Sequence, residues 1–137
     1  MSSPLMEAAV LAGRLLLAAL FLHEAVAKLT GYAAALAYMQ AFGVPGQLLP
    51  FAIALELAGA LLIVLGYQTR AAALVLAAFC VATAMLFHTK FGDRNQLLHF
   101  EKDLAIAGGL LMLFAHGAGA WALDALGRKR APEKSFI

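Results

Sequence analysis

The chain has 137 residues, of which 64% are hydrophobic and only 13% are charged. Soluble domains usually carry about 25% charged residues, so this composition excludes an ordinary soluble domain and indicates a membrane protein. The formal net charge of +2 is too small to indicate nucleic-acid binding. The single cysteine, Cys80, lies inside an apolar run and can form no internal disulfide.

Four apolar segments have the length of about 20 residues that a bilayer core of about 30 Å requires. Small residues are frequent in them and allow helices to pack closely within lipid. We therefore predict an all-α fold, an integral membrane four-helix bundle. Residues 1–127 would form this single domain, and residues 128–137 a basic cytoplasmic tail. The expected spans are residues 5–29, 48–67, 70–89 and 101–123.

The first segment carries charged residues inside its apolar run. No basic region precedes it and Arg14 lies within it, so we expect a retained helix instead of a cleaved signal peptide. At about 100° per residue, Arg14, Glu24 and Lys28 share one arc of this helix, whereas His23 points away. Because charges within a span are costly, we expect Arg14 and Glu56 to form a structural ion pair, directly or through water.

The segment after the first span, residues 30–47, is too polar and too short to cross a membrane. Tyr32, Leu36, Met39 and Phe42 nevertheless recur at about helical spacing. We expect a short amphipathic helix within residues 31–42, lying at the outer membrane surface. A turn around Pro45 would follow it.

The segment between the third and fourth spans, "FHTKFGDRNQLLHFEKD", is unusually polar for this chain. It would connect the two helices on the outer side of the membrane. His99 and Lys102 share a helix face, and His88 ends the preceding helix. We therefore predict one pocket in the outer half of the bundle, lined by His88, His99 and Lys102, with Glu56 beneath and Lys28 beside them.

The distribution of basic residues predicts the orientation. The tail carries Arg128, Lys129, Arg130 and Lys134, and the positive-inside rule places such clusters in the cytoplasm. Four spans then place both termini in the cytoplasm, together with Arg70. The basic residues expected outside are Lys28, Lys90, Arg94 and Lys102.

Four sequence blocks together resemble the DoxX family of small four-helix bacterial inner-membrane proteins, over about residues 10–123. They are "GRLLLAALFLHEAVAKL" at 13–29, "FGVP" at 42–45, "ELAGALLIVLGYQTRAAAL" at 56–74 and "FHTKFGDRNQLLHFEKDLAIAGGLLML" at 87–113. The resemblance implies a multi-pass protein of the bacterial inner (plasma) membrane. The positions that match the family pattern are Arg14, His23, Lys28, Glu56, His88, Asn95, Gln96, His99 and Lys102.

This chain departs from the family pattern at two positions. Glu24 stands where a glycine is usual, and Asp103 stands where an asparagine is common. Both departures add negative charge. They could pair with Lys28 and Lys102, or they could adapt the site to a different ligand.

The first functional hypothesis is a redox membrane subunit, because the family includes relatives of thiosulfate:quinone oxidoreductase subunits. His88, His99, Lys102 and Glu56 would be the catalytic residues that donate hydrogen bonds and carry a proton. Such a site would take a quinone-like or small anionic ligand; the cofactor stays unassigned, with quinone as the candidate. No flavin, nucleotide or iron–sulfur motif is present, so the electrons would come from a redox partner protein or a bound metal. Further ligand-binding residues would be Lys28, His23, Asn95 and Gln96.

Two alternatives remain open at this level. The chain could be a non-enzymatic scaffold or accessory protein that binds membrane lipid or another subunit, including a second copy of itself in a homo-oligomer. Alternatively, His23, His88 and His99 with Glu56 could form a metal or haem site. Their spacing matches no compact ligand motif, so no metal ligands are assigned. The sequence leaves open whether the protein is an enzyme.

Overall fold

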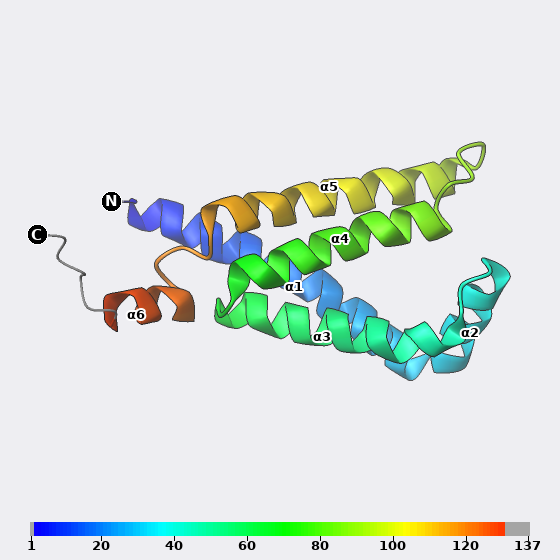
Figure 1. Ribbon diagram of the computed structural model, residues 1–137. Coiled ribbons are helices and arrows are strands. Elements are labelled where there is room, and N and C mark those ends of the chain that lie inside the picture. Colours follow the sequence, from blue (N-terminus) through cyan, green and yellow to red (C-terminus); the bar gives the residue numbers. More distant parts are fainter. Residues whose placement is uncertain (1, 131–137) are drawn as a thin grey trace, which may run out of the picture.

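The computed structural model describes residues 2–130 (Figure 1). These residues contain helices and turns and no β-strand, which confirms the all-α fold. The elements in chain order are α1 (Pro4–Thr30), α2 (Tyr32–Ala41), the short 3₁₀ helix η1 (Gly46–Leu48), α3 (Leu49–Leu65), α4 (Thr69–Phe87), α5 (Arg94–His116) and α6 (Leu123–Arg130).

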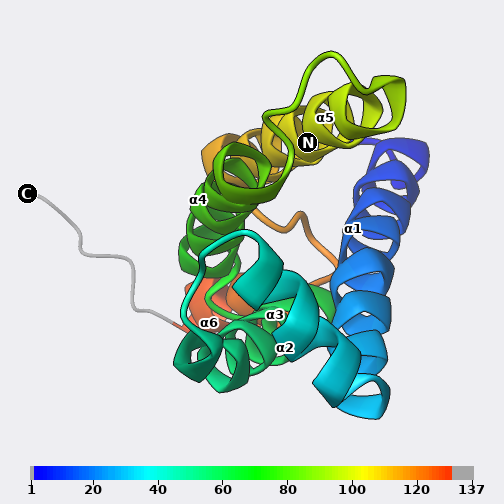
Figure 2. The same cartoon turned by 90° about the vertical axis from the view of Figure 1, so that its right-hand side faces the viewer.

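Four helices form the bundle, which Figure 2 shows nearly end-on. α1 packs along α3, and α4 packs along α5; contact between α3 and α4 joins the two pairs. The N-terminus, the α3–α4 link and α6 lie at one end, and α2 and the α4–α5 link lie at the other (Figure 1). We call these the α6 end and the α2 end.

Three helical stretches within residues 2–130 are long and apolar enough to cross a membrane: Pro4–Thr30, Gly46–Leu65 and Thr69–Phe87. They correspond to the first three expected spans. α5 is not among them, because its first ten residues include Arg94, Glu101, Lys102 and Asp103. It nevertheless packs as the fourth helix of the bundle.

The expected fourth span, residues 101–123, is wrong in its boundaries. α5 already begins at Arg94, because the Asp93 side chain accepts a hydrogen bond from the Asn95 N–H and caps the helix. It ends at His116, because Gly117 has a φ of 81°. Most of the segment expected to be a connection is therefore helical, and only residues 88–93 link α4 to α5.

The predicted helix between the first two spans is present as α2, but it lacks the expected polar face. Apart from two tyrosine hydroxyls, its only polar side chain is Gln40. Tyr38 and the adjacent Phe42 contact Phe87 at the end of α4, with ring centroids 5.4 Å apart in both pairs. Aromatic packing thus attaches this segment to the bundle.

Small residues allow the helices to approach closely in the core. Ala18, Ala60 and Ala73 are fully buried around Leu76. A Cβ atom on Gly59 of α3 would lie 2.9 Å from the Leu76 side chain of α4. This contact sets the α3–α4 separation, because almost any side chain at position 59 would push against a buried leucine.

Replacing Gly59 with alanine should therefore destabilise the protein, by about 1–3 kcal/mol for an overpacked core. Gly108→Ala is the matched control, because a Cβ at position 108 would meet nothing within 4 Å. Thermal unfolding in detergent, followed through labelling of the buried Cys80 thiol, measures both variants. Equal melting temperatures for the two variants would contradict the tight α3–α4 contact.

Candidate functional site

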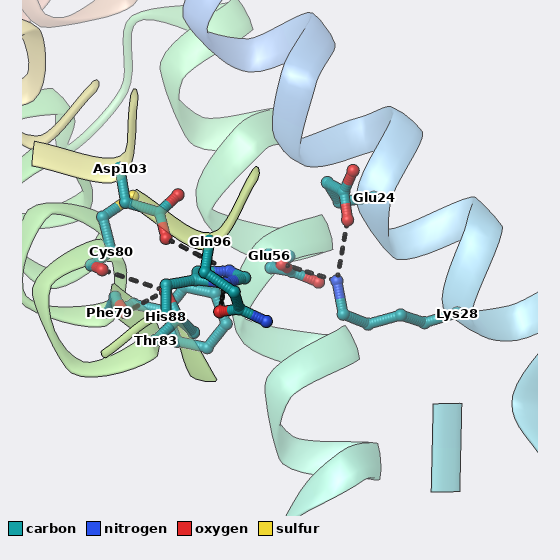
Figure 3. Close-up of polar contacts among 9 residues, drawn as sticks. All are labelled: Glu24, Lys28, Glu56, Phe79, Cys80, Thr83, His88, Gln96 and Asp103. Atoms are coloured by element: carbon teal, nitrogen blue, oxygen red, sulfur yellow. Dashed lines mark hydrogen bonds and ion pairs between the residues drawn. The ribbon is translucent and has the colours of Figure 1, made fainter. Parts of the chain in front are cut away.

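Polar side chains from four helices gather toward the α2 end of the bundle (Figure 3). The last turns of α1, the middle of α3, the end of α4 and the first turns of α5 each contribute. The antiparallel α1–α3 and α4–α5 pairs bring these segments to the same end. We call this set the polar cluster; it comprises Glu24, Lys28, Glu56, His88, Gln96, His99 and Asp103.

Lys28 connects two carboxylates. Its Nζ donates hydrogen bonds to Glu56 Oε1 at 3.0 Å and to Glu24 Oε2 at 3.3 Å. Glu24 lies one turn before Lys28 on α1, a spacing that favours such pairs. The side-chain exposure falls from 48% at Glu24 through 25% at Lys28 to 3% at Glu56. The ammonium group therefore links an exposed acid to a buried one.

Glu56 is the buried acid of the cluster. It shares the inward face of α3 with Ile53, Ala60 and Ile63, at spacings of three, four and seven residues. One of its oxygens binds Lys28, whereas Oε2 is buried and has no hydrogen-bond partner within the described residues. An unpaired buried oxygen is costly, so this atom is positioned to accept a hydrogen bond or a proton.

His88 ends α4 and has a polar neighbour at each ring nitrogen. Nδ1 lies 3.2 Å from Gln96 Oε1, and Nε2 lies 3.8 Å from Asp103 Oδ2. The His99 ring stacks on the His88 ring, with centroids 5.1 Å apart. These contacts fix the position of the His88 ring between the end of α4 and the first turns of α5.

The two groups of contacts belong to one electrostatic environment. Glu24 is close enough to interact electrostatically with Glu56 and with Asp103. In Figure 3, Glu56 lies between Lys28 and the His88–Gln96 contact. The α1–α3 pair and the α4–α5 pair each contribute one of these groups of contacts.

Arg14 does not form the expected ion pair with Glu56, whose partner is Lys28. Its guanidinium donates instead to four backbone carbonyls, those of Ile63, Val64, Ala118 and Trp121. The first two are at the end of α3, where carbonyls lack helical partners. The other two belong to the segment between α5 and α6. Arg14 thus satisfies acceptors that the sequence could not show to be near it.

Other contacts hold the same segment at the α6 end. Glu7 accepts a hydrogen bond from the Ala120 N–H, and the Asp124 carboxylate accepts from the N–H groups of Gln68 and Thr69 at the start of α4. Burial alone would raise the pKa of Asp124, but these hydrogen bonds outweigh burial and lower it. Asp124 therefore caps α4 from another part of the chain.

Three expected site residues lie apart from the cluster's contacts. His23, Asn95 and Lys102 are exposed, and their side chains form no hydrogen bond or ion pair with residues 2–130. His23 lies off the buried face of α1, as its helical position predicted. From the predicted set, the structure brings Lys28 to Glu56, and it brings His88 to Gln96 and His99.

Glu24 and Asp103 were not among the predicted site residues, although each contacts a cluster base. Glu24 could have been assigned from its position four residues before Lys28. Asp103 could have been assigned from its position four residues after His99. Its contact with His88 depends on the register between α4 and α5, which the sequence alone does not reveal.

The described residues carry no converging set of metal ligands, and two apolar grooves lie away from the polar cluster. Within residues 2–130, no three His, Cys, Asp or Glu side chains converge as a metal site would require. Two open grooves are lined by apolar residues alone. One of about 440 Å³ lies on the α4–α5 pair, and one of about 400 Å³ lies between α3 and α4. Neither groove is lined by a residue of the polar cluster.

Arg14→Gln should lower the free energy of unfolding by about 3–5 kcal/mol, because it leaves several buried carbonyls without a donor. Arg70→Gln is the matched control, since exposed Arg70 donates only to Ala115 O. Its effect should stay within about 1 kcal/mol. Chemical or thermal unfolding in detergent provides the measurement, and equal losses for the two variants would refute a special role for Arg14.

Comparisons with known proteins agree with this architecture. The DoxX family matches residues 9–89, more than half of the chain. Inner membrane protein YqjF of Escherichia coli strain K12 is 46% identical over 82 residues, which are 60% of this chain and 63% of that relative. The match thus spans less than two thirds of the relative's length. No solved structure matches the chain. On the family match, which runs from α1 to the end of α4, this chain belongs to the DoxX family.

Proposed function

We propose that this chain is a bacterial inner-membrane protein whose polar cluster binds a small hydrogen-bonding ligand of the quinone type and exchanges a proton with it. Membership of the DoxX family, the similarity to an inner membrane protein of Escherichia coli and the three apolar helices support the membrane location. In a redox role the chain would act as a subunit that receives electrons from a partner protein. Proton exchange would be its own contribution.

The observation that carries this proposal is the buried, unpaired Oε2 of Glu56. Reducing a quinone adds protons as well as electrons, so its site needs a group that accepts and donates protons beside the ring oxygens. A ligand hydroxyl could donate a hydrogen bond to Glu56 Oε2. Lys28 has three donor hydrogens and uses two on carboxylates, so one remains for a ligand carbonyl.

His88 provides a second proton-exchanging group in the cluster. Imidazole is the side chain that changes charge nearest neutral pH. The contacts with Gln96 and Asp103 fix the ring, and the stack with His99 holds its face. A fixed imidazole near a buried carboxylate is suited to proton transfer.

The groove between α3 and α4 supports a ligand with an apolar tail. Its lining residues are Leu48, Phe51, Ala52, Leu55 and Phe79. Leu55 immediately precedes Glu56 in the chain. A quinone whose headgroup reached the cluster could place its tail along this face of α3.

A non-enzymatic role is the second candidate, and the groove on the α4–α5 pair favours it. This groove is wholly apolar and contains several small residues, which suits contact with lipid or a partner helix. Its lining is Leu74, Ala77, Ala78, Val81, Ala82, Ala107 and Leu111. In that role the polar cluster would stabilise the bundle without binding a defined ligand.

For orientation, we propose that the α6 end faces the cytoplasm, because Arg70, Arg128 and Lys129 lie there. Asn95, which is exposed near the α2 end, should then be accessible from outside the inner membrane. Asn95→Cys in a Cys80→Ala background should react with a membrane-impermeant thiol reagent on intact spheroplasts. Reaction only after permeabilisation would contradict this orientation and would place the α2 end in the cytoplasm.

Glu56→Gln should weaken binding of menadione in its reduced, hydroquinone form by about tenfold or more. This headgroup has no long tail, and its hydroxyls can donate to Glu56 Oε2; one lost charged hydrogen bond is worth about 1.5–3 kcal/mol. Titration calorimetry of the detergent-purified protein measures the affinity. Glu101→Gln is the matched control, because Glu101 is exposed on α5 and outside the cluster.

His88→Ala should also weaken menadione binding, whereas Glu101→Gln should not. The melting temperature of each variant is measured as well, so that a loss of affinity can be distinguished from a loss of the fold. If Glu56→Gln lowered the melting temperature yet left menadione affinity unchanged, or if the wild type did not bind menadione, the non-enzymatic role would be favoured.

A further inference from the structure

The charges of the polar cluster are unequal. The cluster contains three carboxylates, those of Glu24, Glu56 and Asp103, and a single ammonium, that of Lys28. His88 and His99 add positive charge only when protonated. With both imidazoles neutral, the cluster has two more negative than positive charges. The other bases near the α2 end, Lys90, Arg94 and Lys102, form no ion pair with the cluster within residues 2–130, whereas Glu24 contacts Lys28 directly.

The bases of the cluster that make polar contacts already have carboxylate neighbours. Lys28 Nζ contacts two carboxylates, at 3.0 Å and 3.3 Å. His88 Nε2 has Asp103 at 3.8 Å. An incoming anion would therefore find these charges already balanced and would meet Glu24 and Asp103 beside them. A neutral or cationic group would meet no such repulsion and could still use Glu56 Oε2.

We propose that Glu24 and Asp103 determine the charge selectivity of this site, so that it admits neutral or cationic headgroups and excludes small anions. This inference rests on the proposed ligand-binding role of the polar cluster, and it narrows the ligand class. Glu24 acts through Lys28, which it holds and neutralises together with Glu56. Asp103 acts beside His88, where its carboxylate lies 3.8 Å from Nε2 and adds negative charge.

The electrostatic field inside the cluster can be measured without a ligand. Gln96→Cys in the Cys80→Ala background places one thiol next to His88. The rate of its modification is measured with two methanethiosulfonate reagents that differ in charge, one carrying trimethylammonium and one carrying sulfonate. Each rate is divided by the rate for a free thiol in solution. The ratio of the two normalised rates reports the local field.

The cationic reagent should react at least about fivefold faster after normalisation, because two excess negative charges attract it and repel the sulfonate. Adding Glu24→Gln and Asp103→Asn should reduce this preference by at least about fivefold. Adding Glu101→Gln, which removes an exposed acid outside the cluster, should change it less than twofold. High salt should weaken the preference.

A normalised ratio near one in the parent protein, or an unchanged ratio after the double substitution, would overturn the charge-selectivity proposal. Melting temperatures of all variants are recorded in the same detergent, so that loss of the fold is recognised. Glu24→Asp and Asp103→Glu keep the charges and should retain the preference for the cationic reagent. Because this assay contains no quinone, its failure is distinct from a failure of menadione to bind.

Discussion

The buried guanidinium of Arg14 is the interaction on which the arrangement of the bundle depends. It donates to the last carbonyls of α3 and to the segment after α5, and so ties three separate parts of the chain together. The backbone at Gly66 lies close to this guanidinium, since a Cβ at position 66 would be 2.9 Å from it. In an apolar environment these carbonyls have few alternative donors, so a single arginine fixes how α1, α3 and the α5–α6 segment meet.

The two ends of the molecule use polar groups in different ways. At the α6 end, Arg14, Glu7 and Asp124 bind backbone groups, which leaves their hydrogen-bonding capacity largely committed to the fold. At the α2 end, side chains bind one another, and Glu56 retains a free oxygen. A network of side chains with an open acceptor can change partners when a ligand or proton arrives. This contrast is the reason that we propose the ligand site at the α2 end.

The two acids that depart from the family pattern have specific partners here. Glu24 contacts Lys28, and Asp103 contacts His88. The pairing of Glu24 with Lys28 was expected. Asp103 was expected to pair with Lys102, but Lys102 is exposed and Asp103 contacts His88 instead. Gln96, His99 and Asp103 lie beyond the matched residues 9–89. Three of the seven cluster residues are thus contributed by a helix outside the family match.

The sequence by itself determined the membrane class, the helical fold, the first three long helices and the segments that contribute to the polar cluster. Hydrophobic length and helical spacing are local properties, so the chain order reveals them. The tertiary structure decided the partners. Arg14 and Glu56 were both buried charges in neighbouring helices, and pairing them was the simplest expectation. Only the folded chain shows that α3 and the α5–α6 segment present free carbonyls to Arg14, which leaves Glu56 to Lys28. Partner choice depends on the register and rotation of packed helices, which are set by contacts distant in sequence.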